Sequence, residues 1–193
     1  MTDASSHQQL DRFITGYWIS QAIYAAAKFG IADELKDGPR SVEELAEATS
    51  TNVDALYRLL RALASKGIFA EGDSRLFSLT PLAEPLRSDV PGSKRALALM
   101  SGDEQFRAWA EIDYSIQTGE IAFERVFSKP IFDYLGENPD KAKIFDAAMV
   151  GILRKCFLRQ IFISRRSPES EFTSSAAWAI RTNARRGGHL STD

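Results

Sequence analysis

The segment from residue 41 to residue 79 constrains the fold more than any other part of this 193-residue chain. Ser41 and Glu44 have the spacing of a capping box, in which a serine and a later glutamate satisfy the first amides of a helix. Thr51 and Asp54 repeat that spacing, so we predict a second short helix directly after the first. Its buried face is expected to be a leucine stripe at helical spacing, made of Leu56, Leu59, Leu60 and Leu63.

A β-hairpin is predicted to follow, because the residues after Gly67 are apolar on both sides of a Gly-Asp-Ser turn at 72–74. Two short helices joined by a tight turn form a helix-turn-helix, and a hairpin behind them makes a winged helix. The other apolar segments have helical spacing. The sequence therefore predicts a mainly α-helical chain that contains one winged helix with a short β-hairpin.

A winged helix raises the alternative that the chain is a DNA-binding transcriptional regulator. Such proteins need Lys and Arg around the second helix and the wing, because phosphate neutralisation supplies much of their affinity. Here the exposed face mixes Arg58, Arg61 and Lys66 with acidic residues. Residues 1–150 carry a net charge of −7, and the remaining residues carry +5, within a chain total of −2. This distribution disfavours DNA as a partner.

Composition and the distribution of apolar residues indicate in which cellular compartment the protein is expected. The sequence contains no run of about 18 apolar residues that could cross a membrane, and its first residues are polar and unlike a signal peptide. Cys156 is the single cysteine, which excludes an internal disulfide and a cysteine-rich metal site. These features favour a cytoplasmic protein with no membrane partner.

The first periodic segment carries an unusually wide aromatic arc that includes Phe13, Tyr17 and Trp18. Such an arc has two interpretations: an ordinary core helix, or a helix whose second face is buried against another chain, as in an obligate dimer. We choose Phe13, Tyr17 and Trp18 as the expected dimer contacts.

Periodicity and charge divide the chain into four segments. A polar N-terminal tail (1–9) precedes a helical, winged-helix domain (10–150) and a helix extension (151–163). The last segment (164–193) is basic and too polar to bury a core, so we expect it to be a disordered tail.

Residues 13–149 resemble the N-terminal domain of the small-molecule, S-adenosylmethionine-dependent O-methyltransferases. The resemblance depends on the order and spacing of four pieces, "AAAKFGIADEL", "SVEELAEATSTNVDALYRLLRALASKGIF", "FSLTPLAEPLRSD" and "WAEIDYSIQTGEIAFERVFSKPIFDYLGENPDKAKIFDAAM". In that family this domain forms a homodimer and lends side chains to the substrate pocket. The resemblance thus implies a small aromatic or isoprenoid ligand, with pocket residues Trp109, Phe123, Phe132 and Met149; the competing interpretation is that these four side chains are simply core.

In the family, a Rossmann-like catalytic domain with a glycine-rich cofactor loop comes next. After Met149 this sequence has too few residues for such a sheet, and Gly187-Gly188 lies in no strand–helix context. We therefore expect the catalytic domain to be absent and this chain to supply no catalytic, cofactor-binding or metal-binding residue. The predicted function is a dimerisation and pocket-lining domain, inactive alone unless another polypeptide supplies the catalytic part. The change of character near residue 150 suggests an interrupted or frame-shifted gene.

Overall fold

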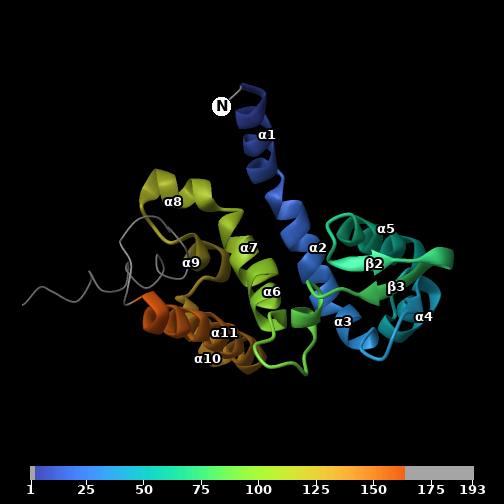
Figure 1. Cartoon of the computed structure of the whole chain (residues 1–193). Helices are drawn as coiled ribbons and strands as arrows, with labels where there is room; N and C mark the ends of the chain where they lie inside the picture. The colour runs from blue at the N-terminus through green and yellow to red at the C-terminus, as the bar shows by residue number, and fades with distance from the viewer. Residues whose placement is uncertain (1–2, 164–193) are drawn as a thin grey trace, which may run out of the picture. The chain divides into compact units, whose positions relative to one another are not determined.

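The computed structural model describes residues 3–163, and the predicted disordered tail lies outside them. The compact body of the chain runs to Cys156. Figure 1 shows that most of it is helical, with one small sheet. The α-helices are α1 (Asp3–Ile14), α2 (Gly16–Lys28), α3 (Ile31–Glu34), α4 (Val42–Thr49), α5 (Val53–Ala64), α6 (Arg95–Gly102), α7 (Glu104–Trp109), α8 (Ile112–Thr118), α9 (Ala122–Phe127), α10 (Ile131–Glu137) and α11 (Pro139–Ile163).

The sheet has three antiparallel strands, β1 (Arg40–Ser41), β2 (Phe69–Glu71) and β3 (Leu76–Leu79), in the order β1-β3-β2. Strands β2 and β3 form the predicted hairpin, and the short 3₁₀ helix η1 (Asp73–Arg75) makes its turn. Together with α4 and α5 they confirm the winged helix. No parallel strand pair occurs within residues 3–163.

The capping box at the start of α4 is formed as predicted. Ser41 Oγ accepts a hydrogen bond from the Glu44 amide, and the Glu44 carboxylate accepts one from the Ser41 amide. The cap predicted for α5 is wrong, because Asn52 occupies the N-cap and its side chain accepts from the Ala55 amide at 3.0 Å. Thr51 instead lies one residue outside the cap.

Two further differences concern helix boundaries. The segment predicted as an N-terminal tail is helical from Asp3, and a break at Thr15 separates α1 from α2. The pair Thr80-Pro81 is typical of a helix start, but no α-helix forms there; the chain makes a turn and then the 3₁₀ helix η2 (Glu84–Leu86). Pro85 explains this, since it has no amide hydrogen to continue an α-helix.

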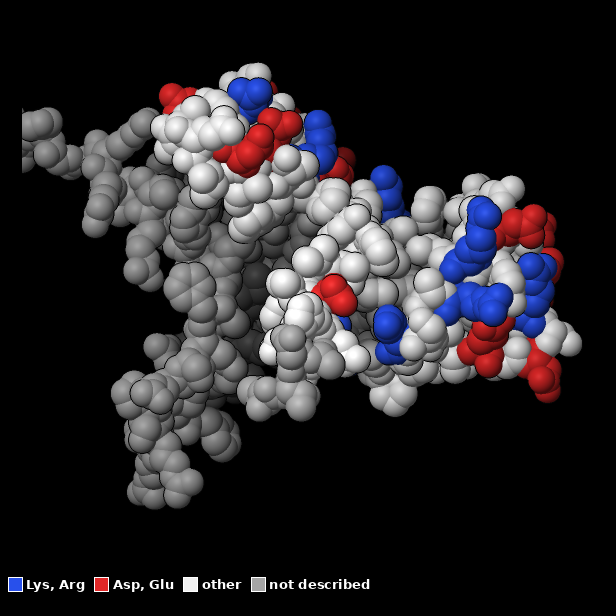
Figure 2. Space-filling model, turned by 90° about the horizontal axis from the view of Figure 1, so that it is seen from above, with Lys and Arg blue, Asp and Glu red and all other residues white. Residues whose placement is uncertain are grey.

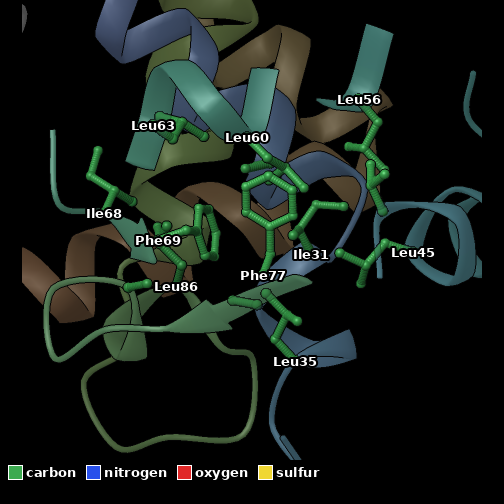
Figure 3. Packing of buried hydrophobic residues seen from close by; sticks show 14 of the residues in the cluster. Ile31, Leu35, Leu45, Leu56, Leu60, Leu63, Ile68, Phe69, Phe77 and Leu86 are labelled. Carbon is green, nitrogen blue, oxygen red and sulfur yellow. The ribbon is translucent and has the colours of Figure 1, made fainter. Parts of the chain in front are cut away.

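The hydrophobic core lies between the sheet and the helices of the winged helix. Figure 3 shows the ring of Phe77 in the middle of this cluster, near Leu60 and Ile31, and all three side chains are fully buried. Leu56, Leu60 and Leu63 form the buried part of the predicted leucine stripe. The core therefore includes residues of α2, α3 and η2 as well as residues of the winged helix.

A second seam joins helix α2, which precedes the winged helix, to helix α6, which follows it. Helices α2 and α6 pack closely, and an added Cβ at Gly102 would lie 2.2 Å from Cγ of Tyr24. Gln21 donates a hydrogen bond to the Gly102 carbonyl. Glycine is therefore required sterically where the two helices meet. No helix within residues 3–163 combines the length and the apolar character needed to span a bilayer.

Candidate functional site

The most unusual surface of the molecule is the apolar side of α1 and the start of α2. Every residue from 5 to 14 is exposed. Phe13 and Trp18 are 73% and 60% exposed. We call this surface the aromatic face and define it by Leu10, Phe13, Ile14, Tyr17 and Trp18.

The aromatic face is not explained by the chain that carries it. A helix of about 12 residues is marginal in water without tertiary packing, and the large apolar side chains of α1, Leu10, Phe13 and Ile14, are all exposed. Figure 2 shows two regions where Lys, Arg, Asp and Glu gather on the side seen from above, with residues of other kinds, polar and apolar alike, between them. Exposed large apolar side chains that follow one another along α1 and the start of α2 are typical of an interaction site. Phe13, Tyr17 and Trp18 are each exposed, and their role as dimer contacts stays a prediction.

The winged-helix surface has a different character. Arg75 lies over the ring of Tyr57, 4.0 Å from its centroid, and also pairs with Glu43 at 3.2 Å. The hydroxyl of Tyr57 donates to the carboxylate of Glu71 at 2.9 Å. Asp54, on the helix that would enter a DNA groove, is 3.8 Å from the Arg75 guanidinium. The basic wing residue is therefore paired with acids of its own chain, which reduces the positive charge that the wing offers to a phosphate backbone.

The four predicted ligand residues occupy different environments. Phe123 is buried, whereas Trp109 and Phe132 are 53% and 58% exposed and Met149 is half-buried. Phe132 packs edge-on against Phe145 with 6.3 Å between the ring centroids. No recorded contact brings the four together, so their shared role as a pocket wall stays a prediction.

Around Phe123 the structure assembles an aromatic cluster that the sequence analysis did not identify. Phe123 packs on Phe127 and meets Tyr134 edge-on, with centroid separations of 4.5 and 5.7 Å. Burial, together with the nearby Glu104 carboxylate, raises the pKa of Tyr134. The Phe123–Phe127 pair has the i,i+4 spacing that a helical pattern reveals, but Tyr134 comes from another helix and gives no such signal.

Next to this cluster, Lys141 at the start of α11 pairs with two acids at the break between α6 and α7. Its ammonium group lies 2.7 Å from the Asp103 carboxylate and also contacts Glu104, whose side chain is only 13% exposed. Burial alone would lower the pKa of Lys141, but the hydrogen bonds to both acids outweigh it and raise that pKa above its usual range. These residues hold helices together; they form no arrangement for acid–base chemistry.

A surface hollow of about 530 Å³ lies beside the wing, lined partly by Arg61, Ser65, Glu71 and Thr80. It contains none of the predicted ligand residues. Within residues 3–163 no group of three or more His, Cys, Asp or Glu side chains is placed to hold a metal ion.

Comparison with known proteins identifies the segment that contains the winged helix and most of the aromatic face. A family model described as the O-methyltransferase dimerisation domain matches residues 11–89. This range contains Phe13, Tyr17 and Trp18 as well as the whole winged helix. Residues 11–89 are therefore an O-methyltransferase dimerisation domain.

Particular relatives extend the match past residue 89. Phenazine O-methyltransferase PhzM of Lysobacter antibioticus is 45% identical over 144 residues, which are 75% of this chain and 42% of the relative. The structure of N,N-8-amino-8-demethyl-D-riboflavin dimethyltransferase (RosA) from Streptomyces davawensis matches with a TM-score of 0.73 and 32% identity, over 80% of this chain and 46% of that one. NcsB1, an O-methyltransferase from neocarzinostatin biosynthesis solved with S-adenosylmethionine and 2-hydroxy-5-methyl naphthoic acid, matches with a TM-score of 0.63 and 30% identity, over 70% and 42%. The chain thus spans less than half the length of these relatives.

Proposed function

We propose that this chain acts as the dimerisation platform of a small-molecule methyltransferase and contributes part of the wall of its acceptor pocket. The observation that carries this proposal is the aromatic face, whose residues other than Leu10 lie inside the matched range 11–89 and which stays exposed within the part of the chain that the structure describes. A second copy of the chain is the expected occupant. The DNA-binding alternative has no support among the relatives described above.

The mass of the full chain in solution, measured by light scattering over a range of concentrations, tests the dimer. Phe13→Ser and Trp18→Ser are expected to weaken the dimer at least tenfold, because each removes a large apolar side chain from the interface. Leu82→Ser is the matched control, since Leu82 is 61% exposed but lies outside the aromatic face. A wild-type chain that stays monomeric at every concentration would contradict the proposal.

The acceptor is proposed to be a planar aromatic molecule. Two of the relatives described above are named for a phenazine or a riboflavin derivative, and NcsB1 was solved with a naphthoic acid; all three molecules contain fused aromatic rings. Exposed Phe132 and half-buried Met149 supply the apolar contacts that such rings favour. Fluorescence titration with 2-hydroxy-5-methyl naphthoic acid checks this step: Phe132→Ala should weaken binding several-fold, and Leu82→Ala should not. Equal affinity in all three proteins would remove Phe132 from the wall.

The related NcsB1 was solved in complex with S-adenosylmethionine. Residues 3–163 offer no parallel sheet on which a nucleotide could lie. We therefore expect isothermal titration of this chain with S-adenosylmethionine to give no heat of binding, so that methyl transfer would depend on a catalytic domain in the same assembly. Stoichiometric heat would contradict this part of the proposal and leave the dimer untouched.

A further inference from the structure

The turn between α3 and β1 contains the single Asp-Gly pair of this sequence, Asp37 and Gly38. Asp37 is exposed and Gly38 is half-buried, and both lie outside any helix or strand. Within residues 3–163 the structure gives the Asp37 carboxylate no hydrogen bond and no ion pair. No contact therefore keeps this carboxyl group away from the main chain beside it.

An aspartate followed by glycine reacts with its own backbone. The Gly38 nitrogen attacks Cγ of Asp37; a new bond forms between nitrogen and Cγ, the nitrogen loses its proton, and one carboxyl oxygen leaves as water. The product is a five-membered succinimide ring, which a second water molecule opens at either of its two carbonyls. Cleavage between the nitrogen and Cγ restores aspartate. Cleavage between the nitrogen and the former backbone carbonyl carbon yields isoaspartate, whose main chain runs through Cβ and Cγ.

Gly38 offers its nitrogen to this reaction with little hindrance. Its φ is +140°, and no atom lies within 4 Å of the position that a Cβ would occupy. Its amide donates to the Leu35 carbonyl at 3.3 Å, which is longer than the usual N–H···O distance of about 2.9–3.0 Å. Since glycine lacks a Cβ, its backbone approaches a neighbouring group without a steric clash. A turn held by one long hydrogen bond opens at little cost in free energy.

The two asparagines of the described chain, which react in the same way with loss of ammonia, are held back. The amide nitrogen of Asn138 donates to a backbone carbonyl one turn earlier at 2.7 Å, and the nitrogen of Pro139 has no proton to lose. Asn52 is bound to a backbone amide of α5 at 3.0 Å, and the β-branched side chain of Val53 shields the nitrogen that would attack. Asp37 is therefore the position in the described chain that is best placed to react.

We propose that Asp37 is a site of spontaneous isoaspartate formation in the folded protein, through a succinimide with the Gly38 nitrogen. The modification adds one methylene group to the main chain of a short link. Leu35 on one side of the link is buried in the core, and Arg40 on the other side begins β1 and pairs with Glu34 across the turn. The longer turn changes how α3 is connected to the sheet. This inference depends on neither the proposed dimer nor the proposed acceptor.

Ageing of the full folded chain in heavy-oxygen water, at neutral pH and physiological temperature, tests the proposal. Hydrolysis of a succinimide places one heavy oxygen in the product, and electron-transfer fragmentation of the peptides distinguishes isoaspartate from aspartate. The peptide with Asp37 should gain the label and isoaspartate several-fold faster than the peptide with Asp73, which precedes a serine in the turn of the wing. Labelling of Asp37 that is no faster than that of Asp73 would overturn the inference.

A variant and an unfolded reference separate the effect of the structure from that of the Asp-Gly pair itself. Asp37→Glu should abolish labelling at this position, because glutamate would have to form a six-membered ring, and the exposed side chain makes retention of the fold the expected result. In urea, wild-type Asp37 should react within a few-fold of its rate in the folded chain, whereas Asn52 should react much faster once its capping bond is lost. An Asp37 that reacts in urea but stays unlabelled in the folded chain would overturn the inference, since the folded turn would then keep the two groups apart. Undiminished labelling of the Asp37→Glu peptide would overturn it as well.

Discussion

The ring of Tyr17 in α2 stacks on the ring of Phe106 in α7, with 27° between the ring planes. Four residues before Phe106, Gly102 lies against Tyr24 of the same helix α2. These two contacts fix how the first helices of the chain meet the helices that follow the winged helix. The position of the aromatic face relative to α7 and α8 therefore depends on this seam.

Replacing Gly102 with alanine is expected to destabilise the protein by about 1–3 kcal/mol, the usual range for an overpacked site. The added Cβ would meet Cβ and Cγ of Tyr24 at 2.3 and 2.2 Å, and rotating the tyrosine ring cannot move its Cβ. Urea denaturation measures the loss. Gly136→Ala is the control, since nothing lies within 4 Å of its Cβ position in α10. Equal stability of both variants would mean that α2 and α6 are further apart than described.

Replacing Phe77 with alanine should cost about 3–5 kcal/mol of unfolding free energy, as for other buried phenylalanines. Its ring is fully buried between α5 and the sheet, so the cavity would open in the middle of the core. Leu76→Ala, at the next position of β3, should cost under ~1 kcal/mol because Leu76 is 39% exposed and leaves no closed cavity. Denaturant midpoints of the two variants give the comparison; a similar loss in both would place the core elsewhere.

Much of this fold follows from local patterns. The leucine spacing of α5 predicts which of its faces is buried, and the Ser41–Glu44 pair predicts where α4 begins. The hairpin is predicted by the apolar residues around its Gly-Asp-Ser turn. Each of these signals lies within a few residues along the chain, which is why a single sequence reveals them.

What the sequence could not predict depends on distant partners. Strand β1 is only two residues long and exists because Arg40 pairs with Phe77, on the far side of the winged helix. The Lys141 pairs with Asp103 and Glu104 likewise join segments with no local signal. The aromatic arc of the first helix was visible, but only the structure shows that its residues are exposed and continue to Phe106.

Duplex DNA should not be retained by this protein in a gel shift at moderate salt. Arg75 of the wing is already paired with Glu43, and Asp54 lies near it on α5, so phosphate binding would have to break contacts within the chain. The informative variant is Glu43→Gln combined with Asp54→Asn, which should still bind no more than weakly and without sequence preference. Tight binding by the wild type that falls steeply with added salt would restore the regulator hypothesis.

The capping box predicts a dependence of stability on pH. Hydrogen bonds from the Ser41 amide and hydroxyl lower the pKa of Glu44 in the folded chain. A carboxyl whose pKa is lower when folded stabilises the protein above its unfolded pKa, about 4.3 for glutamate, and loses that contribution as the pH falls through the folded pKa. The Glu44→Gln variant should therefore lose less stability than wild type on acidification through this range.

Thermal unfolding between pH 7 and pH 3 measures the effect of Glu44. Glu47→Gln, on the same helix, removes a carboxyl that makes no capping bond and serves as the control. Parallel stability curves for wild type and Glu44→Gln would show that the capping bond does not depend on charge.

Replacing Lys141 with methionine is expected to destabilise the chain at pH 7 by about 1 kcal/mol, a figure reduced from that of a fully buried pair because the lysine is 33% exposed. The side chain keeps its length and its packing, but the carboxylate of Glu104, at 13% exposure, would lose its cation. Lys143→Met is the matched control, because Lys143 is 78% exposed and pairs only with Asp140 on its own helix. Urea denaturation at pH 7 should separate the two variants, and hydroxyl-radical footprinting should show whether Trp109 also becomes more reactive when the pair is lost. Because this pair holds α7 against α11, a destabilised Lys141→Met chain with an unchanged α7 would mean that the two helices are held by the aromatic cluster instead.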